Sequence, residues 1–141
     1  MYKEITRIIP HRYPMVMIDG YKRINDDSAL SEKTFFANDY GCDNGTVLDS
    51  ILIECFAQTV AAHYGYKTLQ ERNEKPSMGM LVSVDAFHFF HPVPENTRIS
   101  IFIEKTDQIG PFKIINGEIK INAKLMANGQ IKIYNPENEP G

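Results

Sequence analysis

The stretch VLDSILIECFAQTVAAHYGY, residues 47–66, decides the fold, because it is the only strongly helical run in the chain. A polar line of Ser50, Glu54 and Gln58 crosses it at four-residue spacing, which places these side chains on one face of a helix. Apolar side chains cover nearly all of the remaining surface: Val47, Leu48, Ile51, Leu52, Ile53, Phe56 and Val60. A helix that is apolar all round has to be buried. We therefore predict a central helix wrapped by the rest of the chain.

Glu54 is the residue of this helix that requires an explanation. Burying an unpaired carboxylate costs several kcal/mol or makes the group keep its proton. The sequence therefore predicts either a dedicated partner for Glu54 or a chemical role in which a proton is held and released. Gln58, one helical turn further on, is the expected support.

The segments around the helix predict strands. Residues 15–24 and 28–36 form an expected pair, broken at Asn25-Asp26-Asp27, whose side chains favour turns. Residues 37–46 predict a loop, with Thr46 or Asp49 capping the helix. Later strands are expected at 77–90, as a long central strand, and at 97–105 and 112–125, separated by a turn at Gly110-Pro111. Asn128-Gly129 predicts a hairpin that returns residues 130–134 as the last strand.

One helix and five or six mostly antiparallel strands have one economical arrangement. A sheet that curls around the helix covers the whole helix circumference, which gives an α+β fold. The length of 141 residues fits one domain. We expect this domain over residues 1–134 and a flexible polar tail over residues 135–141.

Composition and charge exclude several classes of function. The net charge is −3, and the 15 Lys and Arg residues are scattered, which speaks against nucleic acid as a partner. Cys42 and Cys55 lack zinc or disulfide spacing, and no histidine pair is spaced for a metal, so we predict free thiols, no metal and no cofactor. The sequence contains no predicted signal peptide or membrane span, and we expect a cytoplasmic protein.

Three motifs together resemble a known family. They are IPHRYPMVMID at residues 9–19, LIECFAQ at 52–58 and HPVP at 91–94. In this order they are similar to motifs of the 3-hydroxyacyl-[acyl carrier protein] dehydratases, which are hotdog-fold enzymes of bacterial fatty acid synthesis. The resemblance covers residues 7–134. It implies a hotdog fold, a dimer joined edge to edge with acyl tunnels at the subunit interface, and an acyl carrier protein or coenzyme A thioester as substrate.

The resemblance also implies roles for individual residues. Glu54 matches the catalytic acid, which protonates the leaving 3-hydroxyl group, and Gln58 would orient it. Backbone N–H groups at the helix start, from about Asp49 to Ile51, would polarise the thioester carbonyl. A lyase of the dehydratase type is the activity expected from these positions.

This chain departs from the family at the general base. The family's Gly-His-Phe-Pro motif places a histidine fourteen positions before the acid, where this sequence has Tyr40. A phenol is a poor base at neutral pH, whereas imidazole suits that task. Tyr40 could still orient a substrate or a water molecule. The family's proline and glycine before the helix are replaced by Leu48 and Asp49, and an acidic Asp49 would repel an enolate.

Four histidines are candidates for the missing base. His11 lies between two prolines and is a candidate base, although we favour a framework role, which the equivalent family residue has. His63 is nine residues after Glu54, which places it on the opposite side of the helix. His88 and His91 alternate along a strand, so at most one of them faces a tunnel. Phe89 is expected either to line the acyl tunnel or to be ordinary core.

Three functions remain open from the sequence. The first is a dehydratase-like enzyme with Glu54 as acid and either His11 or a water molecule held by Tyr40 as base. The second is a hotdog acyl-thioesterase in which Glu54 activates water. The third is a non-catalytic acyl-binding subunit that pairs with a complete dehydratase. We accordingly expect a homodimer, a higher homo-oligomer or a heterodimer.

Overall fold

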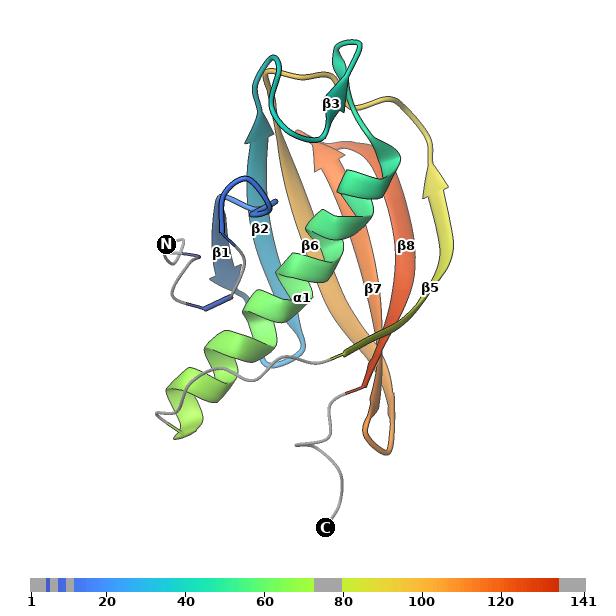
Figure 1. The fold of residues 1–141 in the computed structure, drawn as a ribbon. Coiled ribbons are helices and arrows are strands. Elements are labelled where there is room, and N and C mark those ends of the chain that lie inside the picture. Colours follow the sequence, from blue (N-terminus) through green and yellow to red (C-terminus); the bar gives the residue numbers. More distant parts are fainter. Residues whose placement is uncertain (1–4, 6–7, 10–11, 73–79, 135–141) are drawn as a thin grey trace.

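The central helix, α1, spans Asp49–Arg72 in the computed structural model, which describes residues 5, 8, 9, 12–72 and 80–134. It runs diagonally across the concave side of the sheet (Figure 1). Every residue from Ile51 to Gly65 is buried or half-buried. The predicted wrapping of the helix is therefore confirmed, and the helix is longer at its carboxyl end than the sequence pattern indicates.

The start of α1 differs from the prediction. The carbonyl of Leu48 accepts hydrogen bonds from the N–H groups of Ile51, at 3.0 Å, and Leu52, at 3.2 Å. Leu48 therefore occupies the capping position. The hydroxyl of Thr46 donates instead to the Asp43 carbonyl at 3.2 Å, and Asp49 is already the first helical residue. The predicted cap at Thr46 or Asp49 was wrong, because the hairpin before the helix uses Thr46.

A six-stranded antiparallel sheet curves around α1 in the order β1-β2-β6-β7-β8-β5 (Figure 1). Its strands are β1 Gly20–Arg23, β2 Ser28–Phe35, β5 Met80–Phe89, β6 Thr97–Ile109, β7 Phe112–Ile121 and β8 Lys124–Tyr134. Two short strands, β3 Cys42–Asp43 and β4 Thr46–Val47, form a separate hairpin before the helix. This architecture confirms the predicted α+β fold.

Two predicted turns are confirmed. β1 pairs with β2 across Asn25-Asp26-Asp27, where the Asn25 side chain accepts a hydrogen bond from the Asp27 N–H at 2.9 Å. β6 pairs with β7 across Gly110-Pro111, and Gly110 has a φ of 61°. Both turns are local, so neighbouring residues were sufficient to predict them.

Two strand predictions were wrong. The strand predicted over residues 77–90 as central is β5, an edge strand, and residues 77–79 lie outside the described residues. Its pairing with β8 is interrupted twice by register shifts, as expected for an irregular edge. Asn128-Gly129 forms no hairpin, because β8 runs straight through it, and the turn lies instead at Asn122, with a φ of 55°. The predicted tail, 135–141, lies outside the described residues.

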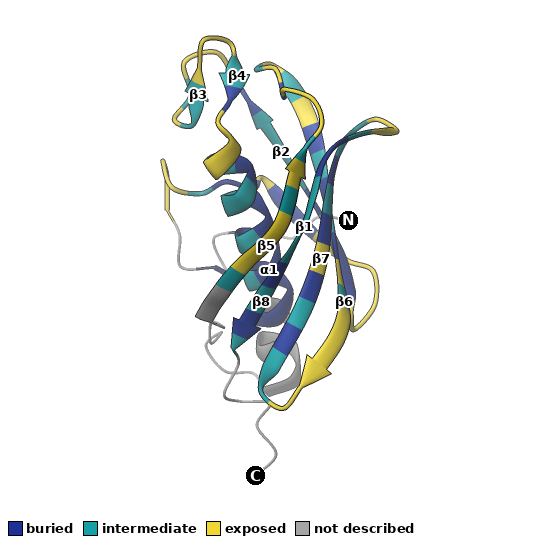
Figure 2. Ribbon diagram, turned by 90° about the vertical axis from the view of Figure 1, so that its right-hand side faces the viewer, coloured by how far each residue is buried: buried dark blue, intermediate teal, exposed yellow. Residues whose placement is uncertain are grey.

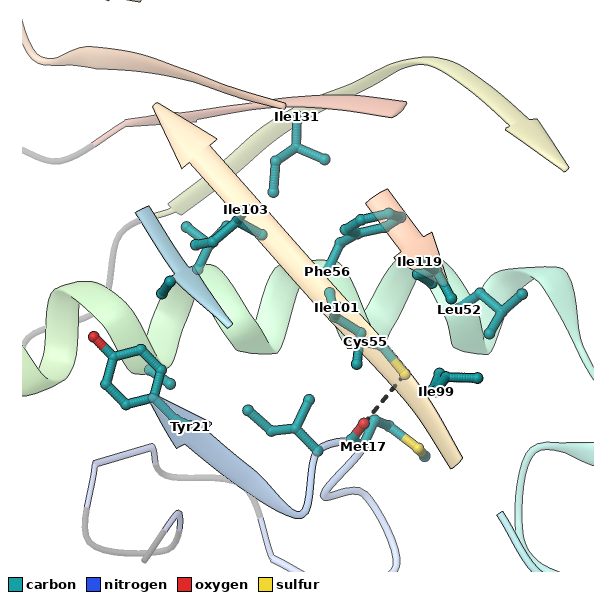
Figure 3. Close-up of a cluster of buried hydrophobic side chains, with 14 of the residues drawn as sticks. Met17, Tyr21, Leu52, Cys55, Phe56, Ile99, Ile101, Ile103, Ile119 and Ile131 are labelled. Atoms are coloured by element: carbon teal, nitrogen blue, oxygen red, sulfur yellow. Dashed lines mark hydrogen bonds between the residues drawn. The ribbon is translucent and has the colours of Figure 1, made fainter. Parts of the chain in front are cut away.

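The core lies between α1 and the concave side of the sheet (Figure 3). From the helix come Leu52, Cys55 and Phe56, each 2% exposed or less. From β6 come alternate residues, which point to the same face of the strand. They are Ile99, Ile101 and Ile103. The inward-facing side chains of β6 and of α1 thus pack together in one apolar layer.

Buried polar contacts fix the helix against β1 and β2. The Thr59 hydroxyl donates to the Cys55 carbonyl at 2.7 Å, so the Ser31 hydroxyl, 2.6 Å away, is the donor to Thr59. His63 Nδ1 lies 2.8 Å from the Tyr21 hydroxyl, and Nε2 donates to the Asp26 carbonyl at 2.7 Å. His63 thus faces the sheet, as its spacing from Glu54 predicted. These contacts set which helix face remains for Glu54.

Candidate active site

Gln58 is the organising residue of the polar line. Its side chain is 1% exposed. Its Oε1 accepts the N–H of Met17 at 2.7 Å, and its Nε2 donates to the Met15 carbonyl at 2.7 Å and to Glu54 Oε1 at 3.0 Å. Because a backbone N–H can only donate and a carbonyl can only accept, these contacts fix the orientation of the amide. Gln58 therefore presents an N–H group to Glu54 from a rigid position.

The polar line passes from solvent into the core. Ser50 is exposed, Glu54 is half-buried and Gln58 is buried. The sequence predicted a buried acid, so the intermediate exposure of Glu54 is a correction. Glu54 lies in the second turn of α1, between the exposed Ser50 and the buried Gln58. The carboxyl group thus lies within reach of a molecule that approaches from the helix start.

The helix start carries an acidic side chain. Asp49 and Ser50 are exposed, and Asp49 lies in the first turn of α1. The N–H of Ile51 is already used by the Leu48 carbonyl. The backbone donors that the sequence predicted there are thus reduced to those of Asp49 and Ser50. A substrate oxygen that binds them has to lie beside the Asp49 side chain.

Tyr40 lies in the loop between β2 and β3 and is 56% exposed. The next residue, Gly41, has a φ of 100°, and a Cβ there would come within 3.0 Å of Ile51. The loop therefore packs closely on the first turn of α1, which holds Tyr40 near the helix start. Within the described part of the chain, the Tyr40 hydroxyl forms no hydrogen bond.

The histidines differ in their surroundings. His63 is held in the core by Tyr21 and Asp26. His88 and His91 are exposed, at the end of β5 and just beyond it. His11 lies outside the described residues, so its role as base or framework stays a prediction.

Phe89 belongs to a row of aromatic rings between β5 and α1. Its half-buried ring stacks on Phe87, with centroids 6.2 Å apart, and Phe87 meets Phe56 at 4.9 Å in an edge-to-face contact. The predicted role of Phe89 in substrate binding stays a prediction. The Phe56 ring lies over Gly117, which the sequence analysis did not single out, and the Phe87 ring lies over Gly129, which it assigned to a hairpin turn. A glycine inside a strand pattern is the signal that could have found them.

The thiols take no part in this arrangement. The Cys55 Sγ donates to the Met17 carbonyl at 3.1 Å, and burial raises the pKa of this thiol well above its ordinary 9.0. Cys55 is therefore a neutral, structural thiol. Cys42 is half-buried and also free. In the parts of the chain that the structure describes, no group of three His, Cys, Asp or Glu residues could hold a metal, and no helix is long and apolar enough to cross a membrane.

Sequence comparisons point to dehydratases. A family model described as ApeP-like, ApeP dehydratase, matches residues 3–140. The 3-hydroxyacyl-[acyl-carrier-protein] dehydratase FabZ of Sinorhizobium fredii is 29% identical over 135 residues, which cover 92% of this chain and 85% of that protein. The enzyme of the same name from Methylobacterium nodulans is 29% identical over 133 residues, with 90% and 83% covered.

Structural comparisons show the hotdog fold. The dehydratase heterocomplex ApeI:P from Xenorhabdus doucetiae contains a chain that matches with a TM-score of 0.85 at 22% identity, covering 96% of this chain and 93% of that one. Cj0977 from Campylobacter jejuni matches with a TM-score of 0.72 at 10% identity, covering 99% and 100%. The hotdog fold that the sequence motifs implied is thereby confirmed.

Proposed function

Because this chain belongs to the ApeP-like dehydratase family, we propose that it supplies the acid half of a site that dehydrates 3-hydroxyacyl thioesters. Its partner is a second hotdog chain that supplies the histidine base. The reaction belongs to fatty acid or polyketide-type biosynthesis in the cytoplasm. The thioester is carried by acyl carrier protein or coenzyme A.

The observation that carries this proposal is the contact between Gln58 and Glu54. Three hydrogen bonds hold the Gln58 amide in one orientation, and one of them ends on the Glu54 carboxyl. An acid that donates a proton to a leaving hydroxyl group needs such a fixed direction. The N–H of Gln58 also stabilises the carboxylate that remains once the proton has left.

The missing histidine base favours a partner chain that supplies it. Tyr40 stands where the family has its histidine. Among the described histidines, His63 is held in the core by Tyr21 and Asp26, and the other two, His88 and His91, are exposed. The similar solved chain belongs to a dehydratase heterocomplex. A complete dehydratase supplies both a histidine and a helix start that lacks the acidic Asp49. We therefore propose a heterodimer in preference to a homodimer.

The proposed reaction conserves every atom and proton. The partner's histidine removes a proton from C2, beside the thioester carbonyl, and the C2–C3 double bond forms as the C3–O bond breaks. Glu54 gives its proton to the leaving hydroxyl, so water and an enoyl thioester are the products. Proton exchange between the histidine and Glu54, directly or through water, restores both groups. Tyr40 would hold the leaving water molecule at the helix start.

The test is an assay of the purified chain, alone and mixed with a histidine-bearing dehydratase whose own acid has been replaced. Enoyl absorbance and free thiol are followed together with a 3-hydroxyacyl thioester. We expect enoyl product only in the mixture and its loss with Glu54→Gln. Glu104→Gln is the matched control, because Glu104 is exposed on β6. Unchanged turnover with Glu54→Gln would contradict the proposal.

Two further variants identify the base. Tyr40→His restores the family's residue, so the chain alone should gain dehydration activity if a base is all that it lacks. His11→Ala should leave the mixture unaffected. Activity of the unmixed chain that disappears with His11→Ala would assign the base to His11 instead. Release of free thiol without enoyl product would favour the thioesterase alternative.

A further inference from the structure

Two glycines face each other on neighbouring strands beneath the helix. Gly117 of β7 pairs with Gly129 of β8. A Cβ on Gly117 would come within 2.2 Å of the Phe56 ring, and a Cβ on Gly129 within 2.4 Å of the Phe87 ring. The missing side chains therefore leave a hollow in the concave side of the sheet, and these two rings fill it.

The two rings are held differently. Phe56 is 1% exposed and lies in the middle of α1. Phe87 is half-buried on the edge strand β5, where Asp85 pairs with Gln130 and His88 with Asn128, so that Ala86 and Phe87 together oppose Gly129. Ala86 has a φ of 52° at this bulge. Phe87 thus lies at the irregular point of a strand with a neighbour on one side only, where a ring is displaced at the least cost.

The filled hollow is wholly apolar. The rings and three isoleucines, Ile103, Ile115 and Ile131, enclose space too small for a water molecule. Hydrocarbon is the kind of group that such a lining accepts. A hydrocarbon group can enter the hollow only if the Phe56 or the Phe87 ring moves out of it.

An apolar path leads from the acid to this hollow. Around the helix from Glu54, at 100° per residue, the next side chains on one side are Ala57 and Ile53, followed by Phe56. Ala57 and Ile53 are both half-buried. On the other side of Glu54 lies Cys55, which is tied to Met17. The side of α1 that carries Ala57 and Ile53 is therefore the open one, and it leads round to Phe56, whose ring meets Phe87 of β5 at 4.9 Å. Figure 2 shows β5 beside α1.

We propose that Phe87 sets the length of the acyl group that this subunit accepts. This inference rests on the proposed function and names the substrate class as short 3-hydroxyacyl thioesters. Their acyl group lies along Ala57 and Ile53 and ends at the Phe87 ring. Longer chains must push Phe87 off Gly129 and so lose its edge-to-face contact with Phe56 and its stacking contact with Phe89.

The test measures how affinity depends on acyl length. Non-hydrolysable acyl-pantetheine amides from butyryl to decanoyl are titrated by calorimetry into the full chain mixed with the histidine-bearing dehydratase. For the wild type we expect affinity to increase with acyl length only among the short ligands. In Phe87→Ala, affinity should go on increasing with longer acyl groups, by about fourfold for each methylene that enters the hollow. Phe90→Ala is the matched control, because Phe90 is 50% exposed and should behave as the wild type.

The outcomes separate the inference from the proposed function. Binding with the same length dependence in the wild type and Phe87→Ala overturns the inference alone. Failure of every ligand to bind overturns the proposed function and the inference with it. Folding is checked by thermal melting, and Phe87→Leu, which keeps most of the apolar volume, replaces Phe87→Ala if the latter does not fold. In Phe87→Leu, affinity should increase with acyl length over fewer additional methylenes than in Phe87→Ala.

Discussion

At the scale of single residues, Gln58 connects the fold to the proposed chemistry. The same amide holds the chain at Met15 and Met17 and directs Glu54. A side chain that serves both purposes couples stability to activity, because its loss leaves buried backbone groups without partners. Glu54 receives the third hydrogen bond of this amide, so its substitution tests the proposed chemistry directly.

Gln58→Leu is therefore expected to lower the free energy of unfolding by about 3 kcal/mol, because the Met17 N–H and the Met15 carbonyl lose their partner. Urea unfolding monitored by circular dichroism measures this loss. Ser50→Ala, on the same face but exposed, should change it by about 0.5 kcal/mol or less. Equal effects of the two substitutions would show that the hydrogen bonds of Gln58 do not anchor the covering segment.

The two thiols should differ in reactivity. The thiolate is the reactive form, and complete burial raises the pKa of Cys55 so that this thiol stays protonated through the pH range in which an ordinary cysteine ionises. Burial and the charges of Glu95 and Asp39 also raise the pKa of Cys42, but this thiol is only half-buried and can be reached by a reagent. Iodoacetamide at pH 8 should therefore label Cys42 and leave Cys55 unmodified until urea unfolds the protein. Mass spectrometry of tryptic peptides makes the measurement. Rapid native labelling of Cys55 would show that the region around Met17 opens.

At the scale of elements, the pairing of β7 with β8 is built around close contact with aromatic rings. Gly117 faces Phe56 and Gly129 faces Phe87. The Asn128-Gly129 pair, which reads as a hairpin turn, serves this contact instead. A glycine that a ring covers and a glycine that a turn requires have the same local sequence signature, and only the partner across the core distinguishes them.

Gly117→Ala should accordingly destabilise the protein by about 1–3 kcal/mol through overpacking against the Phe56 ring. Combining it with Phe56→Leu should recover part of this loss, because the smaller side chain gives room to the new methyl group. Thermal and urea unfolding of both variants make the comparison. Asn116→Ala, exposed on the other face of β7, is the control. Simple additivity in the double variant would argue against the contact.

At the scale of the whole molecule, the sheet has two edge strands. β1 lies at one end of the strand order and β5 at the other. Residues 84–86 of β5 are exposed, and β5 runs beside α1 (Figure 2). An exposed strand edge offers unpaired backbone groups to a second chain. We therefore expect the partner chain to join here.

Val84→Glu should weaken assembly at least tenfold, because it adds a charge beside Asp85 that pairing would bury. Analytical ultracentrifugation of the chain, alone and mixed with a histidine-bearing dehydratase, measures the change. Ile109→Glu is the matched control, because Ile109 is 64% exposed but lies at the β6–β7 turn. Similar weakening by both substitutions, or by neither, would place the interface elsewhere.

The sequence by itself determined the elements whose causes are local. The period of residues 47–66 specified a helix that needs wrapping, and Asn25-Asp26-Asp27 and Gly110-Pro111 specified turns. Alternation specified which segments are strands, but not where β6 ends or where β7 turns into β8. The line of Glu54 and Gln58 followed from helix geometry. These features depend on residues close together in the chain, so one sequence was sufficient to predict them.

Only the tertiary structure decided the features that depend on contacts across the chain. It placed β5 at the edge, assigned Gly129 to the Phe87 ring, gave the capping position to Leu48 and left Glu54 half-buried. Gln58 reaches Met15 and Met17 across more than forty residues. Such contacts arise from packing between segments far apart in the chain, which local periodicity does not specify. Packing therefore decided that Gln58 is held rigidly and orients the Glu54 carboxyl group.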